Sequence, residues 1–168
     1  MEMSFPLAGA TQAEQDLFWM QRAFRLAQKA ESEGEVPVGA VIVADGMCVA
    51  EGWNQTIQNH DPTAHAEMVA LRAAGQAIQN YRLGGVTLYV TLEPCPMCAS
   101  AMVHARVKRL VIATRDPRTG AAGSVFNLVQ EPRLNHFVEV EYGVLEQEAC
   151  HQLKQFFKQK RAQRKNKS

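Results

Sequence analysis

The sequence predicts an α/β protein with a mixed sheet and helices on both of its faces. Short strand-like apolar segments alternate with segments of helical periodicity along most of the chain. The first two strand-like segments are joined by Asp45-Gly46, a strong signal for a two-residue hairpin turn. An antiparallel hairpin followed by strand–helix alternation gives a mixed sheet. The length of 168 residues fits one domain with a single sizeable core.

The first part of the chain contains one predicted helix and the two strands of the hairpin. Thr11-Gln-Ala-Glu14 is a capping-box pattern followed by apolar residues at helical spacing, so a helix is expected at about 12–32, before Gly34. Residues 38–43 predict a short buried strand, and residues 47–53 predict the strand that returns from the turn.

The second part continues the alternation of helices and strands. Asp61-Pro62 fits the N-cap and first position of a helix that is expected to run to about residue 77. A third strand is predicted at 86–91, and Pro94 and Pro96 interrupt it. The remaining predicted elements are a helix through about residue 105, a strand within 106–113, a short helix near 124–130, a strand near 136–142 and a helix at about 145–163.

Positive charge is concentrated at the C-terminal end of the chain. The net charge is only +1, but residues 154–168 hold seven basic side chains and no acidic one. The other 153 residues therefore hold 11 basic and 17 acidic side chains. An acidic body with a basic end indicates a polyanionic partner. We expect an irregular segment at 1–10, one domain at 11–157 and a basic tail at 158–168.

The composition is that of a soluble globular protein in a reducing compartment. Apolar residues make up 46% of the chain and charged residues 21%. No apolar run approaches the ~20 residues that span a bilayer, and the first ten residues lack the basic start of a signal peptide. These features predict a cytoplasmic protein without membrane contact, whose four cysteines are thiols or metal ligands rather than disulfides.

Cys95 and Cys98 are the first candidates for chemistry. Two thiols at this spacing occur in zinc half-sites, in redox motifs and on ordinary helix turns. Their combination with His65-Ala-Glu67, which is separated from Pro94 by 26 residues, is far more specific and predicts a zinc site. Zinc favours thiolate and imidazole ligands, so His65, Cys95 and Cys98 are the expected ligands. Each would lie at the start of a helix, where free N–H groups lower the pKa of a thiol.

The number of ligands separates a catalytic from a structural zinc site. Three protein ligands leave the fourth position for water, whereas a structural site closes with four. Cys48 and Cys150 are rival fourth ligands, but a place on a strand and on the terminal helix favours ordinary buried thiols. Glu67, near His65 at the helix tip, is the expected general acid–base beside the water. On its own, Glu67 would be interpreted as a carboxylate that complements the helix dipole.

His65-Ala-Glu67 together with Pro94-Cys-Pro-Met-Cys98 resembles the signature of the zinc-dependent nucleobase deaminases. Within this superfamily the chain is most similar to the bacterial tRNA-specific adenosine deaminases, and the similarity covers residues from about 15 to 160. The further stretches that carry it are Glu35-Val-Pro-Val-Gly-Ala-Val41, Gly52-Trp-Asn54 and Arg115-Asp-Pro-Arg-Thr-Gly-Ala-Ala-Gly-Ser124.

The resemblance implies a three-layer α/β/α sandwich with a five-stranded mixed sheet, as in cytidine deaminases, and a homodimer with one Zn²⁺ per subunit. It implies hydrolytic deamination of adenosine to inosine at the wobble position of a tRNA anticodon, with a zinc-activated water and Glu67 as the proton shuttle. Asn54 would hydrogen-bond the flipped base or its ribose, and Arg115 and Asp116 would lie near the bound anticodon loop. Without the resemblance, Asn54 is interpreted as a turn former and Arg115-Asp116 as a solvated loop pair.

The terminal helix is expected to contact RNA through rings and charges. Of Phe156 and Phe157, at least one is expected to pack, and Phe157 is the candidate for stacking on an unpaired base, while Lys158–Lys167 meet phosphates. Two other functions stay open. One is a zinc deaminase of a free base or nucleoside such as guanine or cytidine, and the other is a non-catalytic, zinc-stabilised RNA-binding module.

Overall fold

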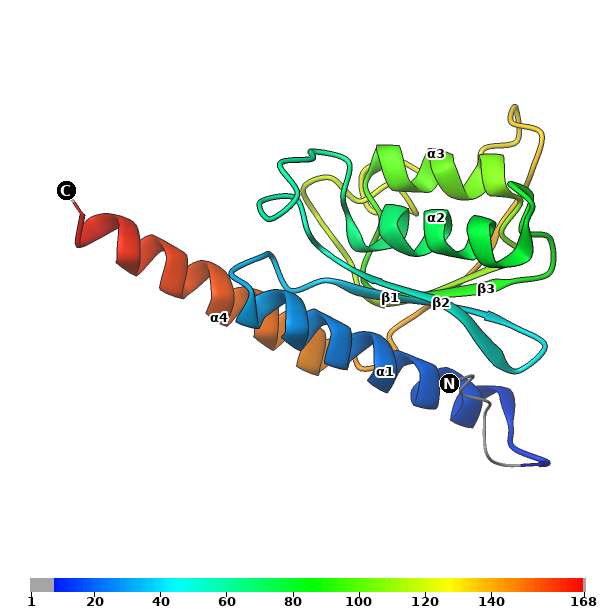
Figure 1. Cartoon of the computed structure of the whole chain (residues 1–168), viewed down its shortest axis with the longest axis horizontal. Coiled ribbons are helices and arrows are strands. Elements are labelled where there is room, and N and C mark those ends of the chain that lie inside the picture. The colour runs from blue at the N-terminus through cyan, green and yellow to red at the C-terminus, as the bar shows by residue number, and fades with distance from the viewer. Residues whose placement is uncertain (1–7, 168) are drawn as a thin grey trace.

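The chain folds into three layers, with a central sheet between two pairs of helices (Figure 1). The structure is a computed structural model that describes residues 8–167. In chain order the elements are α1 (Gln12–Ser32), β1 (Gly39–Ala44), β2 (Met47–Trp53), α2 (Ala66–Ile78), β3 (Thr87–Leu92), α3 (Pro96–Ala105), β4 (Arg109–Thr114), β5 (Glu139–Tyr142) and α4 (Glu146–Lys165). The predicted α/β/α sandwich with a five-stranded mixed sheet is confirmed. Of the irregular segment predicted at 1–10, residues 1–7 lie outside the described residues.

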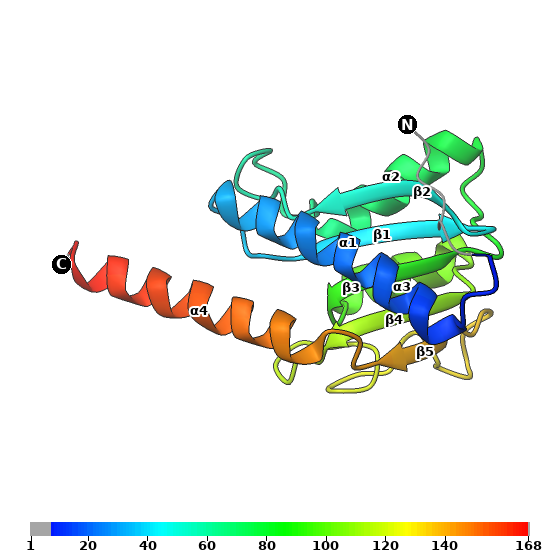
Figure 2. The same ribbon diagram turned by 90° about the horizontal axis from the view of Figure 1, so that it is seen from below.

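The strand order explains where ligand-binding residues gather. The sheet has the order β2-β1-β3-β4-β5 (Figure 2). Strand β1 is antiparallel to both β2 and β3, whereas β3, β4 and β5 are parallel to one another. Four strands therefore point the same way, and the direction of β5, which the sequence leaves open, is now defined. Their carboxyl ends form the edge where α/β proteins place their ligands.

Each face of the sheet is covered by one pair of helices. Helices α2 and α3 lie on one face, and α1 and α4 lie on the other (Figure 1). Buried side chains fill both interlayer spaces, with Leu88, Met102 and Leu110 on the α2–α3 side and Trp19 and Met20 on the α1 side. Among residues 8–167 we find no helix with the length and apolar character to span a bilayer.

Local signals define the first helix and the hairpin as predicted. The Thr11 hydroxyl accepts the Glu14 backbone N–H, and the Glu14 carboxylate accepts the Thr11 backbone N–H, so the capping box is formed. Asp45 and Gly46 both have positive φ angles, 50° and 73°. This conformation gives the two-residue turn that matches the twist of paired strands.

Two glycines let helices approach the hairpin closely from opposite faces. A Cβ at Gly39 would lie 2.1 Å from the carbonyl oxygen of Ala23 in α1. A Cβ at Gly52 would lie 2.2 Å from the carbonyl oxygen of Ala66, the first residue of α2. Any larger side chain at Gly52 would displace the start of α2 from the sheet.

The predicted start of α2 at Asp61-Pro62 is wrong. The Asp61 carboxylate accepts the Thr63 backbone N–H at 2.8 Å and the Thr63 hydroxyl at 2.7 Å, which closes a turn instead of capping a helix. The helix begins at Ala66, and His65 is its N-cap residue. This later start moves His65 out of the first helical turn to the tip of the helix.

The short helix predicted near 124–130 is also absent from the part of the chain that the structure describes. Ala122 and Asn127 form an isolated antiparallel bridge there. The backbone N–H groups of Ala122 and Ser124 donate to the carboxylate of Glu93, each at 3.1 Å. Further along, the N–H groups of Val125 and Phe126 donate to the Gly120 carbonyl, and the Leu128 N–H donates to the Ala121 carbonyl, so these donors close turns and not a helix.

A buried ion pair fixes α1 to the sheet. Arg109 of β4 donates two hydrogen bonds of 2.7 Å to the carboxylate of Asp16, which also accepts the Tyr89 hydroxyl at 2.9 Å. Burial by itself would raise the pKa of Asp16, but hydrogen bonds from Arg109 and Tyr89 and the charge of Arg109 outweigh burial and lower it. Asp16 is therefore a charged residue in the interior.

The final helix extends beyond the rest of the molecule (Figures 1 and 2). Its first half packs on β4 and β3, with Leu153 and Phe156 buried. Residues 158–165 of the predicted basic tail continue the same helix. The basic side chains of this tail therefore lie on the part of α4 that extends away from the rest of the molecule.

Candidate metal centre and active site

Two helix N-termini meet at the carboxyl edge of the sheet. Strand β2 leads through residues 54–65 into α2, and β3 leads through Glu93-Pro94 into α3. His65 is the N-cap residue of α2 and Cys95 is the N-cap residue of α3, both with extended backbone. Neither side chain caps its own helix. Both side chains are therefore available to a ligand.

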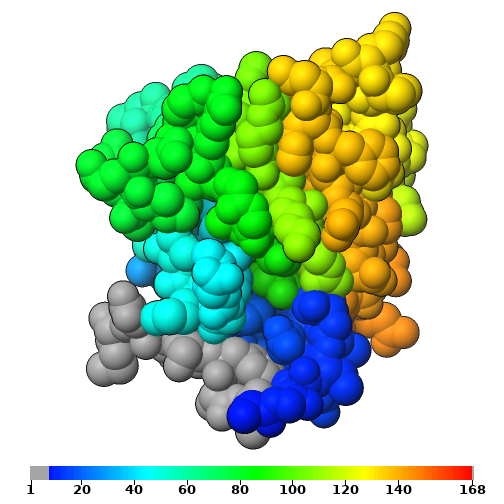
Figure 3. Space-filling model, turned by 90° about the vertical axis from the view of Figure 1, so that its right-hand side faces the viewer, coloured from blue at the N-terminus to red at the C-terminus, as the bar shows by residue number. Residues whose placement is uncertain are grey.

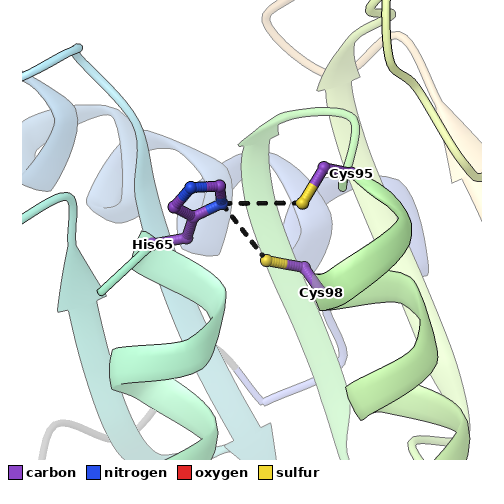
Figure 4. A group of neighbouring side chains, drawn as sticks. All are labelled: His65, Cys95 and Cys98. Atoms are coloured by element: carbon purple, nitrogen blue, oxygen red, sulfur yellow. Dashed lines mark hydrogen bonds between the residues drawn. The ribbon is translucent and has the colours of Figure 1, made fainter. Parts of the chain in front are cut away.

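His65, Cys95 and Cys98 form a compact group (Figure 4). Nδ1 of His65 lies 3.6 Å from Sγ of Cys95 and 3.6 Å from Sγ of Cys98. All three ligand atoms lie within 4.8 Å of one another. Tetrahedral zinc, with Zn–N near 2.0–2.1 Å and Zn–S near 2.3 Å, would separate nitrogen and sulfur by about 3.6 Å. The donor set and its spacing therefore fit a zinc ion.

Contacts among the three groups shift their pKa values. A hydrogen bond from Cys98 lowers the pKa of Cys95 to about 4, against the effect of burial and with help from His65. The same hydrogen bond, together with burial, raises the pKa of Cys98. The hydrogen bond with Cys95 raises the pKa of His65. Zinc binds the deprotonated thiol, so the low pKa of Cys95 suits a ligand, whereas Cys98 would release its proton when a metal binds.

Glu67 lies next to this group, in the first turn of α2. Its side chain is 4% exposed, and burial raises its pKa to about 7, although its own backbone N–H and the charge of His65 act in the opposite direction. The carboxylate also interacts with the Cys98 thiol. A buried carboxyl group at this position can accept and release a proton near neutral pH.

Asn54 has a structural contact and one free donor. Its side-chain oxygen accepts the backbone N–H of Ala66 at 2.8 Å, so it caps α2 in the way that His65 does not. In the described residues the side-chain nitrogen of Asn54 has no hydrogen-bond partner. The alternative interpretation of Asn54 as a turn former is thus replaced by capping of the helix that carries Glu67, and its predicted contact with the substrate stays a prediction.

A cleft separate from the metal group brings together the other predicted substrate-binding residues, Arg115, Asp116 and Phe157. They line a cleft of about 480 Å³ between α4 and the segment that follows β4. The other residues that line it are Leu92, Thr114, Pro117, Arg118, Thr119, Cys150, Leu153, Lys154 and Arg161. None of the three predicted metal ligands borders this cleft. It contains four cationic side chains and one carboxylate.

The contacts of these cleft residues limit what each can do. The Arg115 guanidinium lies over the Tyr142 ring, 3.8 Å from its centroid. The Asp116 carboxylate accepts hydrogen bonds from the Arg118 and Thr119 backbone and from the Thr119 hydroxyl, so it holds a turn. Phe157 is 44% exposed, whereas Phe156 is buried. Phe156 packs as expected, and the Phe157 ring contacts it edge to face, with the centroids 5.4 Å apart, while keeping an exposed side.

The rival fourth ligands lie apart from the metal group. Within residues 8–167 the group contains only His65, Cys95 and Cys98. Cys48 lies on β2, half-buried, and Cys150 borders the cleft on α4. Both thiols are half-buried and not buried as expected, and neither closes the metal site.

Two buried carboxylates at the carboxyl edge of the sheet were missed by sequence reasoning. Glu93 is enclosed by the segment after β4, and Glu35 accepts the backbone N–H groups of Ile57 and Gln58 at 2.9 and 2.8 Å. Each organises a loop at the carboxyl edge of the sheet. The only local signal was an acidic residue directly beside an apolar strand, at Leu92-Glu93.

Comparison with known proteins places the chain in a family. The family model for the cytidine and deoxycytidylate deaminase zinc-binding region matches residues 13–114, which include all three predicted ligands. The chain therefore belongs to the zinc-binding cytidine and deoxycytidylate deaminases. This family assignment agrees with the metal group and with the fold.

Individual relatives show which deaminases within this family the chain is similar to. The tRNA-specific adenosine deaminase of Haemophilus influenzae is 50% identical over 159 residues, covering 94% of this chain and 92% of the relative. The tRNA-specific adenosine deaminase of Bacillus subtilis is 48% identical, covering 90% and 97%. A solved structure from a study of A-to-I editing by tRNA:A34 deaminases at the wobble position of transfer RNA has a TM-score of 0.79 and 41% identity, covering 81% and 99%.

Proposed function

We propose that this chain is a zinc-dependent hydrolase of the cytoplasm that converts adenosine to inosine at the wobble position of a tRNA anticodon. The observation that carries the proposal is the three-ligand group of His65, Cys95 and Cys98 with the buried Glu67 beside it. The tRNA-specific adenosine deaminases that match almost the whole chain support the choice of substrate.

The proposed chemistry is hydrolysis of the C6–N bond of adenine. When bound by His65, Cys95 and Cys98, zinc lowers the pKa of water to about 7 and supplies hydroxide at neutral pH. Glu67 accepts the proton that the attacking water loses and delivers it to N1 of adenine. Glu67 then takes the proton of the new hydroxyl on C6 and gives it to the departing amine. Ammonia leaves, and C6 keeps the oxygen as the carbonyl of inosine.

Asn54 has two roles in this proposal. Its oxygen caps α2 and so positions Glu67 through the helix. Its free amide nitrogen is proposed to donate a hydrogen bond to the base or its ribose. The base must leave its stack to reach a pocket, which costs least in a single-stranded loop.

The cleft beside α4 is the proposed surface for the anticodon loop. Arg115, Arg118, Lys154 and Arg161 line it, and phosphates are the natural partners of such a group. The exposed ring of Phe157 can stack on an unpaired base. Asp116 fixes the turn that presents Arg118 and is proposed to act through the backbone.

We further propose a homodimer, formed through the outer face of α2 and α3. Among residues 8–167 no element covers this face (Figure 1). It contains a groove of about 600 Å³ lined in part by Met68, Leu71 and Tyr81, and the Tyr81 ring is 71% exposed. The connection between β4 and β5, with exposed Phe126 and Phe137, adjoins the α2–α3 layer (Figure 3). Sedimentation equilibrium tests this, and we expect Tyr81→Asp to shift the mass toward one chain.

Incubation with an anticodon stem-loop that carries adenosine at the wobble position tests the function. We expect inosine by nucleoside analysis and one ammonia released per inosine. The matched control substrate has the adenosine one position along the loop and should not react. Deamination of free guanine or cytidine, but not of the stem-loop, would contradict the proposal in favour of a free-base enzyme. RNA binding without any ammonia would indicate a non-catalytic module.

A further inference from the structure

We propose that Glu93 is a positioning residue that fixes residues 114–124, the RNA-facing segment, to the strand end that leads into the cysteine ligands. This inference rests on the proposed function, because that function assigns the segment to RNA. Glu93 directly follows β3 and precedes Cys95 by two residues. It is placed to connect the metal group with the cleft.

The side chain of Glu93 is surrounded by donors from the segment. It is only 2% exposed. One oxygen accepts the Asp116 backbone N–H at 3.1 Å and the Ser124 hydroxyl. The other accepts the backbone N–H groups of Ala122 and Ser124, each at 3.1 Å. Within residues 8–167 it forms no ion pair, so its charge is balanced by oriented N–H and O–H groups.

The backbone around Glu93 is tied to the same segment. The Glu93 N–H donates to the Thr114 carbonyl at 2.9 Å, and the Ala121 N–H donates to the Pro94 carbonyl at 2.8 Å. A Cβ at Gly120 would lie 2.4 Å from the carboxyl carbon of Glu93. The segment therefore packs closely against residues 93–94 and is hydrogen-bonded to both of them.

This arrangement requires a carboxylate. Both oxygens act as acceptors for two donors each, and only an ionised carboxyl group offers acceptors on both sides. In Glu93→Gln an amide NH₂ would replace one oxygen and would face at least one backbone N–H, that of Asp116 on one side or those of Ala122 and Ser124 on the other. Buried donors without an acceptor are costly, so we expect the segment to loosen. The loosened residues include Arg115, Asp116 and Arg118, which line the cleft.

The test compares wild type, Glu93→Gln and Asp16→Asn. Asp16→Asn is the matched control, because it also neutralises a buried carboxylate but lies in α1, where it contacts Arg109 at the start of β4, away from the segment. For Glu93→Gln we expect one zinc per chain, and backbone amide exchange at 116, 122 and 124 faster by roughly tenfold. We also expect KM for the stem-loop to rise at least about tenfold, with kcat per zinc-loaded chain little changed. Asp16→Asn should lower thermal stability without altering KM or these exchange rates.

The outcomes separate a positioning role from general destabilisation. A fall in kcat at unchanged KM, unchanged amide exchange, or loss of zinc from Glu93→Gln would each overturn the proposal. If wild type forms no inosine, the proposed function fails, and the positioning role is then decided by amide exchange and by the Kd for the stem-loop. If Glu93→Gln does not fold, Ser124→Ala, which removes one donor, replaces it. That variant should shift exchange and KM in the same direction, and an absence of both shifts refutes the role.

Discussion

Replacing Gly52 with alanine tests whether the close approach of α2 to β2 sets the geometry of the metal centre. A Cβ at this position would lie 2.2 Å from the Ala66 carbonyl oxygen and 2.7 Å from the Ala70 nitrogen. Ordinary contacts begin near 3.4 Å, so the first turn of α2 would have to retreat by roughly 1 Å. His65 and Glu67 lie at that end of the helix and would move with it.

The displacement is large compared with what a metal site tolerates. Zinc–ligand distances are held within about 0.2 Å, so moving His65 by more than this weakens its bond to an ion held by the two sulfurs. We expect zinc affinity to fall by about 10–100-fold, the range found when the support of a ligand is lost. Overpacking costs roughly 1–3 kcal/mol, which corresponds to a decrease in Tm of about 2–12 °C for a chain of this size.

Gly75→Ala is the matched control, because it makes the same change in the interior of α2. A Cβ there would meet only the Asn80 carbonyl oxygen at 3.5 Å, which is ordinary contact. Removing a glycine from a helix interior should stabilise the protein by about 0.5–1 kcal/mol. Zinc affinity is measured by competition with a chromophoric chelator, and Tm by thermal unfolding with and without zinc. If Gly52→Ala and Gly75→Ala behave alike in both measurements, the reasoning about close approach is refuted.

Four further outcomes are expected. Glu67→Ala should retain stoichiometric zinc by metal analysis but lose about 10²–10⁴ in deamination rate; normal turnover would disprove its role. Cys95→Ala should lose zinc while Cys48→Ala keeps it, and full occupancy in the first variant would exclude Cys95 as a ligand. Deleting residues 158–168 should raise the Kd for the stem-loop and reduce the salt slope by up to ~0.7 for each lost phosphate contact; an unchanged slope would exclude this segment. Asp16→Asn should cost roughly 3 kcal/mol in urea unfolding at pH 7. Because the folded pKa of Asp16 is lowered, this difference should be complete above about pH 5 and shrink as the pH falls through the folded pKa, and a constant difference would contradict the ion pair.

Features that depend on neighbours in the sequence could be predicted. The capping box at Thr11 and the hairpin at Asp45-Gly46 need only residues within one turn, and both form as expected. The same reasoning failed at Asp61 because its carboxylate had two local uses. It closes a turn with Thr63 by accepting both the N–H and the hydroxyl of that residue. The helix therefore begins only at Ala66.

Features that depend on distant residues could not be predicted. The sequence predicts a short helix near 124–130, but the Ser124 N–H donates to Glu93, about thirty positions earlier in the chain, and the Val125 and Phe126 N–H groups donate to the Gly120 carbonyl. The direction of β5 depends on the path of that long segment. Likewise, no spacing in the sequence pairs Asp16 with Arg109. A buried ion pair of this kind can be identified only from the three-dimensional structure, because its two residues belong to different layers.

The predicted site residues fall into two groups on different layers. The metal group and Glu67 belong to α2 and α3 on one face of the sheet, whereas the cationic cleft is formed by α4 on the other face. The two groups approach each other only at the carboxyl ends of β3 and β4. An RNA loop that uses both must therefore cross this edge, where Glu93 joins the segment after β4 to the start of α3. If the cleft binds RNA as proposed, we expect RNA affinity and metal affinity to be separable, with changes in α4 leaving the ligand geometry intact and changes at Gly52 leaving the cleft intact.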